Sequence, residues 1–206
     1  MFVVIFEVQP KPEAWDAYLA HASALKPELE QIEGFLDNER FASRTRPGWL
    51  VSLSTWSDEK ALIRWRSQGH HHAVQADGRA RVFQDYRLRV GEVATDSAPP
   101  PGVGLAQQRF DATVTGQAKA ALLAEGPDAT LGAGPPADAA GALVRWDRFD
   151  SISTPGKGLA LSFWRAPPAV PGPPEPAPGR RRVVRIVRDY GMFDRAEAPQ
   201  YHPPVG

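Results

Sequence analysis

The sequence contains no cysteine, which excludes disulfides, thiolate catalysis and zinc or iron–sulfur sites with cysteine ligands. It also has no net charge, because 24 lysines and arginines balance 24 aspartates and glutamates. A chain without an overall field has no general attraction to nucleic acid or to an anionic membrane. We therefore expect neither nucleic acid nor a membrane as a partner.

Long apolar runs are missing as well. The first six residues, MFVVIF, are apolar, but Glu7 follows, and prolines stand at positions 10 and 12. This stretch is too short to span a membrane and lacks the basic lead of a signal peptide. We interpret it as a strand and expect a cytoplasmic protein.

Common catalytic motifs are also missing. The sequence has neither a glycine-rich phosphate-binding loop nor a G-x-S-x-G nucleophile elbow. Three consecutive histidines, His70 to His72, do stand out. Neighbouring side chains on a helix point about 100° apart, so these three cannot converge on one metal ion, and we expect no metal site.

Prolines divide the chain into two parts. Residues 1–98 hold four of the 21 prolines, and the remaining residues hold the other 17. Residues 96–104 have no apolar periodicity and predict a linker, and residues 166–179 predict an extended loop, since proline interrupts helices and central strands. We predict a first domain at 1–95, a second at 105–198 and a C-terminal tail at 199–206.

The first part carries a readable order of elements. Residues 2–8 predict a strand, and a helix follows Pro12, split or kinked at Pro27 and ended by Gly34. A hairpin is predicted at 35–42 and 49–56, then one helix from Ser57 to about Gln75, and a last strand at 81–90. This βαββαβ order predicts a ferredoxin-like sheet with both helices on one face.

An internal repeat predicts how the second part is built. Residues 40–56 and 148–164 align without gaps at an offset of 108, with eight of 17 positions identical. Asp85-Tyr86 also matches Asp189-Tyr190, at an offset of 104. Convergence of two hairpins is the alternative, but duplication explains the match better. The shorter second copy is then expected to lack the second helix.

Two ferredoxin-like repeats can bury their bare sheet faces against each other. We therefore predict an α+β fold in which one chain forms a pseudo-dimeric α+β barrel. Two such chains can also form a further homodimer. The space between the two facing sheets is the predicted cavity for a small hydrophobic ligand.

The second predicted helix carries the candidate chemistry. His71 or His72 can face a cavity and exchange a proton near neutral pH; the alternative is a solvated helix end. Trp65 lies on nearly the same helical face, about two turns away, and is otherwise a core residue. Arg40 and Arg148 recur in both repeats, which favours structural ion pairs, with their neighbours Glu39 and Asp147 or with Asp85 and Asp189, over a substrate role.

The first 95 residues resemble the antibiotic biosynthesis monooxygenase (ABM) superfamily, through FVVIFEVQPKPEAWDAY, LVSLSTW-SDEKAL and the Trp65…His72…Gly78…Phe83-Gln84-Asp85-Tyr86 tail. The resemblance implies a dimeric α+β barrel. Quinone-forming members need no cofactor and place an amide four residues before a helix tryptophan and a tyrosine six after it. Here those two positions are Ala61 and His71.

The resemblance also supplies candidate site residues. We expect His71, His72 and Trp65 to be catalytic, and Phe6, Tyr86 and Arg87 to bind substrate, with Arg89 as the other candidate for the strand arginine of this family. Haem-degrading members use a strand-one asparagine and a histidine ten residues after the tryptophan. This sequence has no asparagine in its first strand and has Gln75 at the second position, which makes haem degradation the weaker hypothesis.

Two functions of different class follow. The first is a cofactor-independent monooxygenase that oxidises a small aromatic or polyketide-like phenol with O2, using His71 or His72 as the base. The second is a non-catalytic barrel that binds a small hydrophobic ligand, with a haem-binding or haem-degrading protein as a weaker third hypothesis.

Overall fold

The computed structural model describes residues 1–132, 134, 141–167 and 179–198. Its strands and helices follow one another as β1 (Phe2–Pro10), α1 (Trp15–Glu30), β2 (Phe35–Ser43), β3 (Leu50–Trp56), α2 (Glu59–Ser67), α3 (Gly69–Asp77), β4 (Phe83–Asp96), β5 (Ala120–Pro127), β6 (Leu143–Ser151), β7 (Lys157–Trp164) and β8 (Arg180–Gly191). A 3₁₀ turn precedes α1, a π-helical turn joins α3 to β4, and another 3₁₀ turn, Asp128–Thr130, follows β5.

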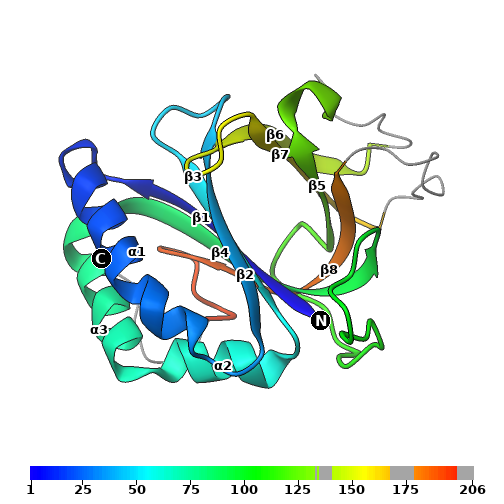
Figure 1. Ribbon diagram of the computed structural model, residues 1–206, viewed down its shortest axis with the longest axis horizontal. Helices are drawn as coiled ribbons and strands as arrows, with labels where there is room; N and C mark the ends of the chain where they lie inside the picture. Colours follow the sequence, from blue (N-terminus) through cyan, green and yellow to red (C-terminus); the bar gives the residue numbers. More distant parts are fainter. Residues whose placement is uncertain (133, 135–140, 168–178, 199–206) are drawn as a thin grey trace.

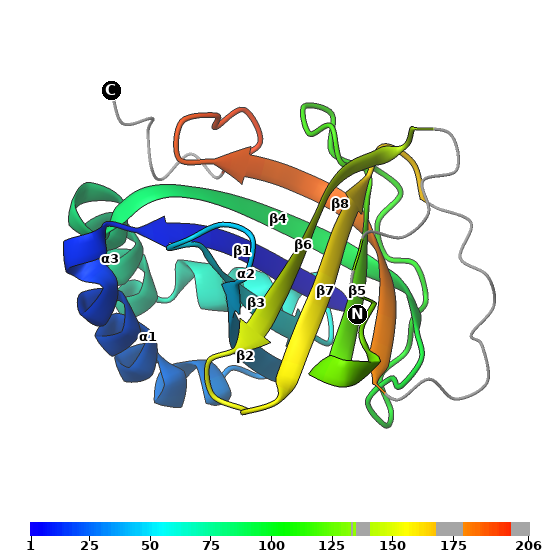
Figure 2. The ribbon, with the colours of Figure 1, turned by 90° about the horizontal axis from the view of Figure 1, so that it is seen from above.

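All eight strands form one closed antiparallel barrel, in the order β1-β3-β2-β6-β7-β5-β8-β4 (Figures 1 and 2). Within each half, the fourth strand lies beside the first, followed by the third and the second, which is the order of a ferredoxin-like sheet. The halves join at two seams, β2 with β6 and β4 with β8. The predicted α+β fold of two ferredoxin-like repeats that close into a pseudo-dimeric barrel is confirmed.

The strand register tests the repeat residue by residue. β2 and β6 begin and end at positions 108 apart, and Ala42 lies opposite its own equivalent, Asp150, at the first seam. Phe2 and Ala120 lie opposite the equivalent tryptophans Trp56 and Trp164. β1 and β5 therefore occupy equal places in the barrel.

The predicted match in the last strand is wrong. Glu7 of β1 and Glu125 of β5 are equivalent, since they lie opposite Val51 and Leu159, which are 108 apart. On their other side they lie opposite Arg87 and Arg180. The last strands are therefore related by an offset of 93, and the likeness of Asp85-Tyr86 to Asp189-Tyr190 at an offset of 104 is a coincidence.

Helices cover the outer face of the first sheet, as Figure 2 shows. In the second repeat, the described part of the segment between β5 and β6 contains only the 3₁₀ turn. Residues 128–142 are also fewer than the residues 11–34 that carry α1 in the first repeat. Most of the predicted proline-rich loop, residues 168–178, lies outside the described residues, as does the predicted tail at 199–206.

Two helix predictions need correction. Pro27 lies inside α1, which runs through it as one element. The predicted single helix after Ser57 is instead two, α2 and α3, because Gln68 has an extended backbone with φ −64° and ψ 131°.

The barrel interior is filled, so the predicted cavity between the two sheets is wrong. Apolar side chains of both repeats meet there and are almost completely buried; they include Val3, Ile5, Phe41, Phe149 and Phe163. Close packing of this kind leaves no room for a ligand. A second apolar layer lies between the first sheet and its helices, around Phe2, Leu29 and Trp56.

Candidate functional site

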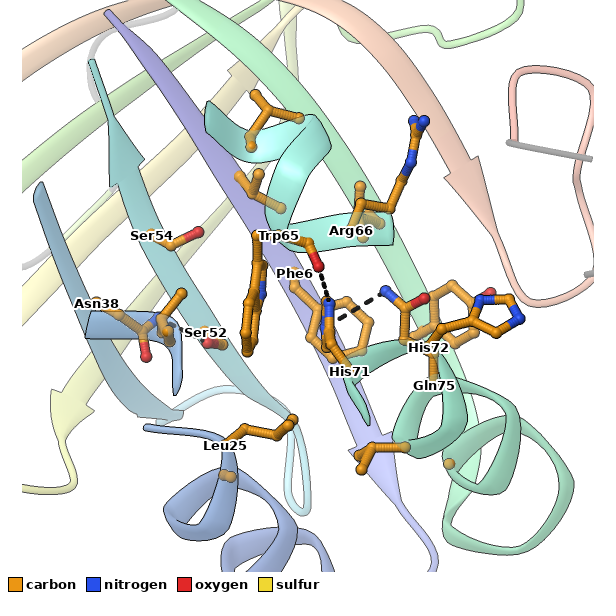
Figure 3. A pocket seen from close by; sticks show the side chains of 18 of the residues that line it. Phe6, Leu25, Asn38, Ser52, Ser54, Trp65, Arg66, His71, His72 and Gln75 are labelled. Carbon is orange, nitrogen blue, oxygen red and sulfur yellow. Dashed lines mark hydrogen bonds between the residues drawn. The ribbon is translucent and has the colours of Figure 1, made fainter. Parts of the chain in front are cut away.

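A pocket of about 320 Å³ lies between the outer face of the first sheet and helices α1 to α3 (Figure 3). Strand alternation decides which residues reach it. Val4 and Phe6 of β1 and Leu88 and Val90 of β4 face the pocket, whereas Ile5 and Arg89 point into the barrel. The pocket floor is therefore an apolar sheet surface, and its roof is made of helices.

Trp65 and His71 form the centre of the pocket wall (Figure 3). Their rings are stacked, with centroids 4.1 Å apart and an interplanar angle of 14°. His71 Nδ1 lies 2.9 Å from the carbonyl oxygen of Trp65, and because a carbonyl only accepts, this nitrogen carries the proton. Nε2 then keeps its lone pair, and the side-chain nitrogen of Gln75 lies 3.4 Å from it.

Burial lowers the pKa of His71 to about 4, although the hydrogen bond to Trp65 acts in the opposite direction. At neutral pH the imidazole is therefore uncharged, with a proton acceptor at Nε2. Such a group can take a proton from a substrate hydroxyl once the product of the transfer is stabilised by its surroundings.

The break at Gln68 explains why Trp65 and His71 touch. On one continuous helix they would lie about two turns apart, as predicted, but the extended residue turns α3 back towards the end of α2. The Gln68 side chain accepts a hydrogen bond from the His71 backbone N–H at 2.7 Å and donates one to Glu28 of α1 at 2.5 Å. The break thus positions His71 and is tied to the opposite helix.

A polar strip borders the same pocket and was not predicted. Asn38 of β2 donates to Ser52 Oγ at 3.0 Å and to the Leu53 carbonyl at 3.1 Å, and Trp56 Nε1 donates to Ser54 Oγ at 2.9 Å. Asn38, Ser52 and Ser54 all line the pocket, on the side of Trp65 away from His72 (Figure 3). Polar residues at alternate strand positions, on the face that bears helices, were the signal that could have found them.

Arginines form the other polar part of the lining. Arg40, Arg66, Arg79, Arg188 and Arg195 all reach the pocket. Arg79 and Arg195 both donate to the hydroxyl of Tyr86, the latter at 2.7 Å. Arg188 and Arg195 come from the second repeat, so the pocket extends across the β4–β8 seam.

Five of the six predicted site residues line this pocket: Phe6, Trp65, His71, His72 and Tyr86. Arg87 does not. It lies on the opposite face of β4 from Tyr86 and Leu88, and its guanidinium is paired with Asp189 at 2.5 Å and Asp194 at 3.2 Å. The structure therefore separates Arg87 from the pocket, and Arg89, the other candidate, pairs with Glu7 inside the barrel.

The predicted ion pairs of the repeated arginines are also corrected. Arg148 pairs with Asp128, and Asp147, its sequence neighbour, pairs with Arg46 instead. Arg40 faces the hydroxyl of Tyr18 in the pocket. The two equivalent arginines therefore have different partners in the two repeats.

The described parts of the chain contain no group of three or more histidines and carboxylates placed to hold a metal ion. Within the same residues, no helix has both the length and the apolar character needed to cross a membrane.

Comparison with known proteins places the chain in a family. A family model described as antibiotic biosynthesis monooxygenase matches residues 1–77. A jasmonate monooxygenase of Pyricularia oryzae is 38% identical over 220 residues and covers the whole of both chains. A crystal structure of an antibiotic biosynthesis monooxygenase is 26% identical, with a TM-score of 0.40, and covers 48% of this chain and all of its own.

A Fusobacterium nucleatum protein is similar over 98% of this chain and 97% of its own, with a TM-score of 0.44 and 6% identity. The full-length match to the Pyricularia protein is the decisive one, because it includes both repeats. The chain belongs to the antibiotic biosynthesis monooxygenase family.

Proposed function

We propose that this protein is a monooxygenase that oxidises a small, largely apolar phenol with O2 in the pocket beside Trp65 and His71, without a bound cofactor. The stacked Trp65–His71 pair carries the proposal. It presents an uncharged imidazole to a pocket with an apolar sheet floor, and a substrate hydroxyl that displaces the Gln75 side chain, 3.4 Å from Nε2, reaches the acceptor. A substrate that fills this pocket displaces water from around its anion, which favours the reaction with O2.

The reaction balances without an external reductant for a substrate whose phenol is conjugated to a methylene group. His71 Nε2 takes the phenol proton, and the resulting anion gives electrons to O2. A C–O bond forms at the methylene carbon, and the peroxide then loses water to leave a carbonyl group. The substrate supplies all four electrons, one oxygen atom enters the product, and His71 returns its proton to the departing water.

The neighbours of His71 support this role. The face of Trp65 attracts a cation, so the stack stabilises His71 when it is protonated. The arginines of the lining stabilise the substrate anion at the same moment. Both effects favour proton transfer from the substrate to His71, which the low pKa of His71 in the ligand-free protein opposes.

The relative from Pyricularia supports a second candidate substrate, a non-aromatic organic acid such as jasmonate. Hydroxylation of a C–H bond in such a molecule consumes O2 and two further electrons and gives one hydroxyl group and one water. The two electrons must come from a reductant such as NADPH.

Oxygen uptake by the purified protein tests both candidates. Anthrones, naphthols and hydroquinones are offered without reductant, and jasmonate is offered with and without NADPH. We expect uptake with a member of the first group and a loss of about a hundredfold or more in His71→Ala. His72→Ala tests the second histidine, and Lys60→Ala, on the exposed side of α2, is the control.

The outcomes separate the hypotheses. Uptake that requires NADPH and jasmonate selects the second candidate. No uptake above the uncatalysed rate on any substrate, with binding retained, contradicts the proposal and favours the ligand-binding barrel. A shifted haem absorption band on titration would favour the haem hypothesis.

A further inference from the structure

The pocket has an excess of positive charge that the rest of the molecule does not share. Among the described residues, five arginines line it and one carboxylate, Glu59, which already accepts two hydrogen bonds from Arg109, at 2.7 and 3.0 Å. The whole chain is neutral, and buried arginines elsewhere have acidic partners, as Arg89 has Glu7 and Arg182 has Glu125. An excess of arginines over carboxylates at a cavity favours an anionic ligand.

Two of these arginines have side-chain N–H donors without a partner among the described residues. Neither Arg66 of α2 nor Arg188 of β8 makes a side-chain hydrogen bond or an ion pair with any described residue. Arg66 Nε is buried and has no hydrogen-bond partner. A buried donor without a partner destabilises the free protein, so a ligand that accepts a hydrogen bond from it binds more tightly.

The other three arginines are engaged. Arg79 and Arg195 share the Tyr86 hydroxyl, and Arg40 faces the hydroxyl of Tyr18. Arg66 and Arg188 are therefore the pair with open guanidinium groups.

These two arginines line the same pocket as Tyr190, Arg66 from α2 and Arg188 from β8. The Arg195 guanidinium lies 5.6 Å from the Tyr190 ring. Burial raises the pKa of Tyr190 to about 12, and the positive charges of Arg66, Arg195 and Arg188 all oppose this rise. Arg188 and Tyr190 lie opposite Val90 and Leu88, so they continue the pocket wall across the seam between the repeats.

We infer that Arg66 and Arg188 form a carboxylate-binding subsite, so that the substrate is an organic acid whose anionic end is held partly by the second repeat. The guanidinium fork matches a carboxylate through two parallel hydrogen bonds. The apolar floor made by Phe6, Leu88 and Val90 suits the body of a monocarboxylic acid. The inference rests on the proposed function only where it calls this acid the substrate.

Binding of matched acids and neutral analogues tests the subsite independently of turnover. Jasmonate is compared with its methyl ester, and 1-naphthoate with 1-naphthamide, by isothermal titration calorimetry. We expect at least one acid to bind about tenfold or more tightly than its neutral analogue. Arg188→Gln and Arg66→Gln should each weaken that acid about ten- to hundredfold and leave the neutral analogue unchanged.

Arg181→Gln is the matched control, since it removes the same charge from an exposed position of the same strand and should change neither affinity. Arg188→Lys keeps the charge without the fork and should retain part of the preference, which covers the case in which the glutamine variant does not fold. Equal affinity for acid and analogue, an equal loss of both in Arg188→Gln, or binding of none of the four overturns the subsite.

The two proposals fail separately. A preference for the acid that depends on Arg188, without oxygen uptake, keeps the subsite and contradicts the monooxygenase. Oxygen uptake that needs His71, with no preference for acids, keeps the monooxygenase and contradicts the subsite.

Discussion

The hairpins of the two repeats end in tryptophans that occupy equal places, Trp56 and Trp164, and each makes a 2.9 Å hydrogen bond to the serine two residues before it. Beyond the hairpins the repeats differ. The first carries three helices on its outer sheet face, and the described part of the second carries none. The pocket lies under those helices, so the connections between strands, not the sheet itself, make the site.

The residue before each hairpin, Gly34 in the first repeat, shows that the sequence is adapted to the helices of that repeat. Gly34 in the first repeat corresponds to Ala142 in the second, and both carbonyls accept a 2.8 Å hydrogen bond, from Ser57 and Arg165 respectively. A Cβ at position 34 would lie 2.5 Å from Ser57 Oγ and 2.7 Å from Ala61 Cβ. The glycine is needed where α2 begins, because Ser57 and Ala61 of that segment leave no room for a Cβ at position 34.

The barrel interior, in contrast, is shared. Glu7 and Glu125 are equivalent carboxylates that point inwards and pair with basic side chains. Glu7 pairs with Arg46 and Arg89 of its own repeat and with Arg145 of the second, and Glu125 pairs with Lys157 and Arg182 of its own repeat. Because the barrel interior is shared, equivalent substitutions inside it should change the stability of the protein similarly in both repeats. Equivalent substitutions at the helix-covered face should not.

The largest effect is expected at the inward carboxylates. Glu7→Gln and Glu125→Gln should each lower the free energy of unfolding by about 3 kcal/mol, since the first leaves the half-buried Arg145 and the second the buried Arg182 without its carboxylate partner. Urea unfolding measures this, with the exposed Glu13→Gln as the control. A loss below about 0.5 kcal/mol in either variant would contradict a shared charged interior.

Glu7 also predicts a pH dependence. Burial opposes its ionisation, but the charges of Arg145, Arg89 and Arg46 outweigh burial and hold its pKa below the usual 4.5. Its contribution to stability is present above about pH 4.5 and is lost as the pH falls through the lowered value. Glu7→Gln should remove this part of the acid dependence.

His71 should make the free energy of unfolding depend on pH by about 3 kcal/mol. Its pKa in the folded protein is about 4, against 6.5 for an exposed histidine, so the unfolded chain binds the proton first. The free energy of unfolding should therefore fall as the pH drops from about 6.5 to about 4 and stay level above that range. His71→Phe should flatten this segment of the curve, and an unchanged slope would contradict the burial of an uncharged ring.

Gly34→Ala should cost about 2–3 kcal/mol, because its φ of +87° and the two close contacts both disfavour a side chain. Gly156→Ala, at a similar φ of +77° but in open space, should cost only about 1 kcal/mol. Ala142→Gly should cost about 0.5–1 kcal/mol. Thermal and urea unfolding compare the three, and equal losses at positions 34 and 156 would refute the role assigned to α2.

The smallest effect is expected at the β2–β6 seam. Ser43 donates to Asp147 at 2.7 Å, and its equivalent Ser151 donates to Glu39 at 2.5 Å. Ser43→Ala and Ser151→Ala should each cost about 1 kcal/mol. The control is Ser153→Ala, at an exposed position, and a twofold difference between the seam variants would break the symmetry at this seam.

The sequence predicted the fold well because its signals are local. Strand alternation, turn residues and the gapless repeat at offset 108 each depend on neighbouring residues, and the register confirms them. The prediction that Asp85-Tyr86 matches Asp189-Tyr190 was wrong, because two identical residues are too few to align one strand with another. The strand partners of Glu7 and Glu125 were needed to determine the alignment.

The site was predicted less completely, for physical reasons. Trp65 and His71 are close in sequence and could be found, but their stacking depends on one extended residue, Gln68. Its sequence signal is the following Gly69, which a continuous helix also tolerates. Both faces of β1 are apolar, so alternation alone could not say which face has the pocket. Arg188 could not be found, because the seam brings it to the pocket from the other repeat.

The helices α1 to α3 also fix how many ligand molecules the protein takes up. In an assembly of two identical chains, each groove occurs twice, and occupancy of one can influence the other. Here, within the described residues, the helices that roof the pocket occur once for eight strands. A titration should therefore saturate at one equivalent per chain and follow a simple hyperbola with a Hill coefficient of about 1.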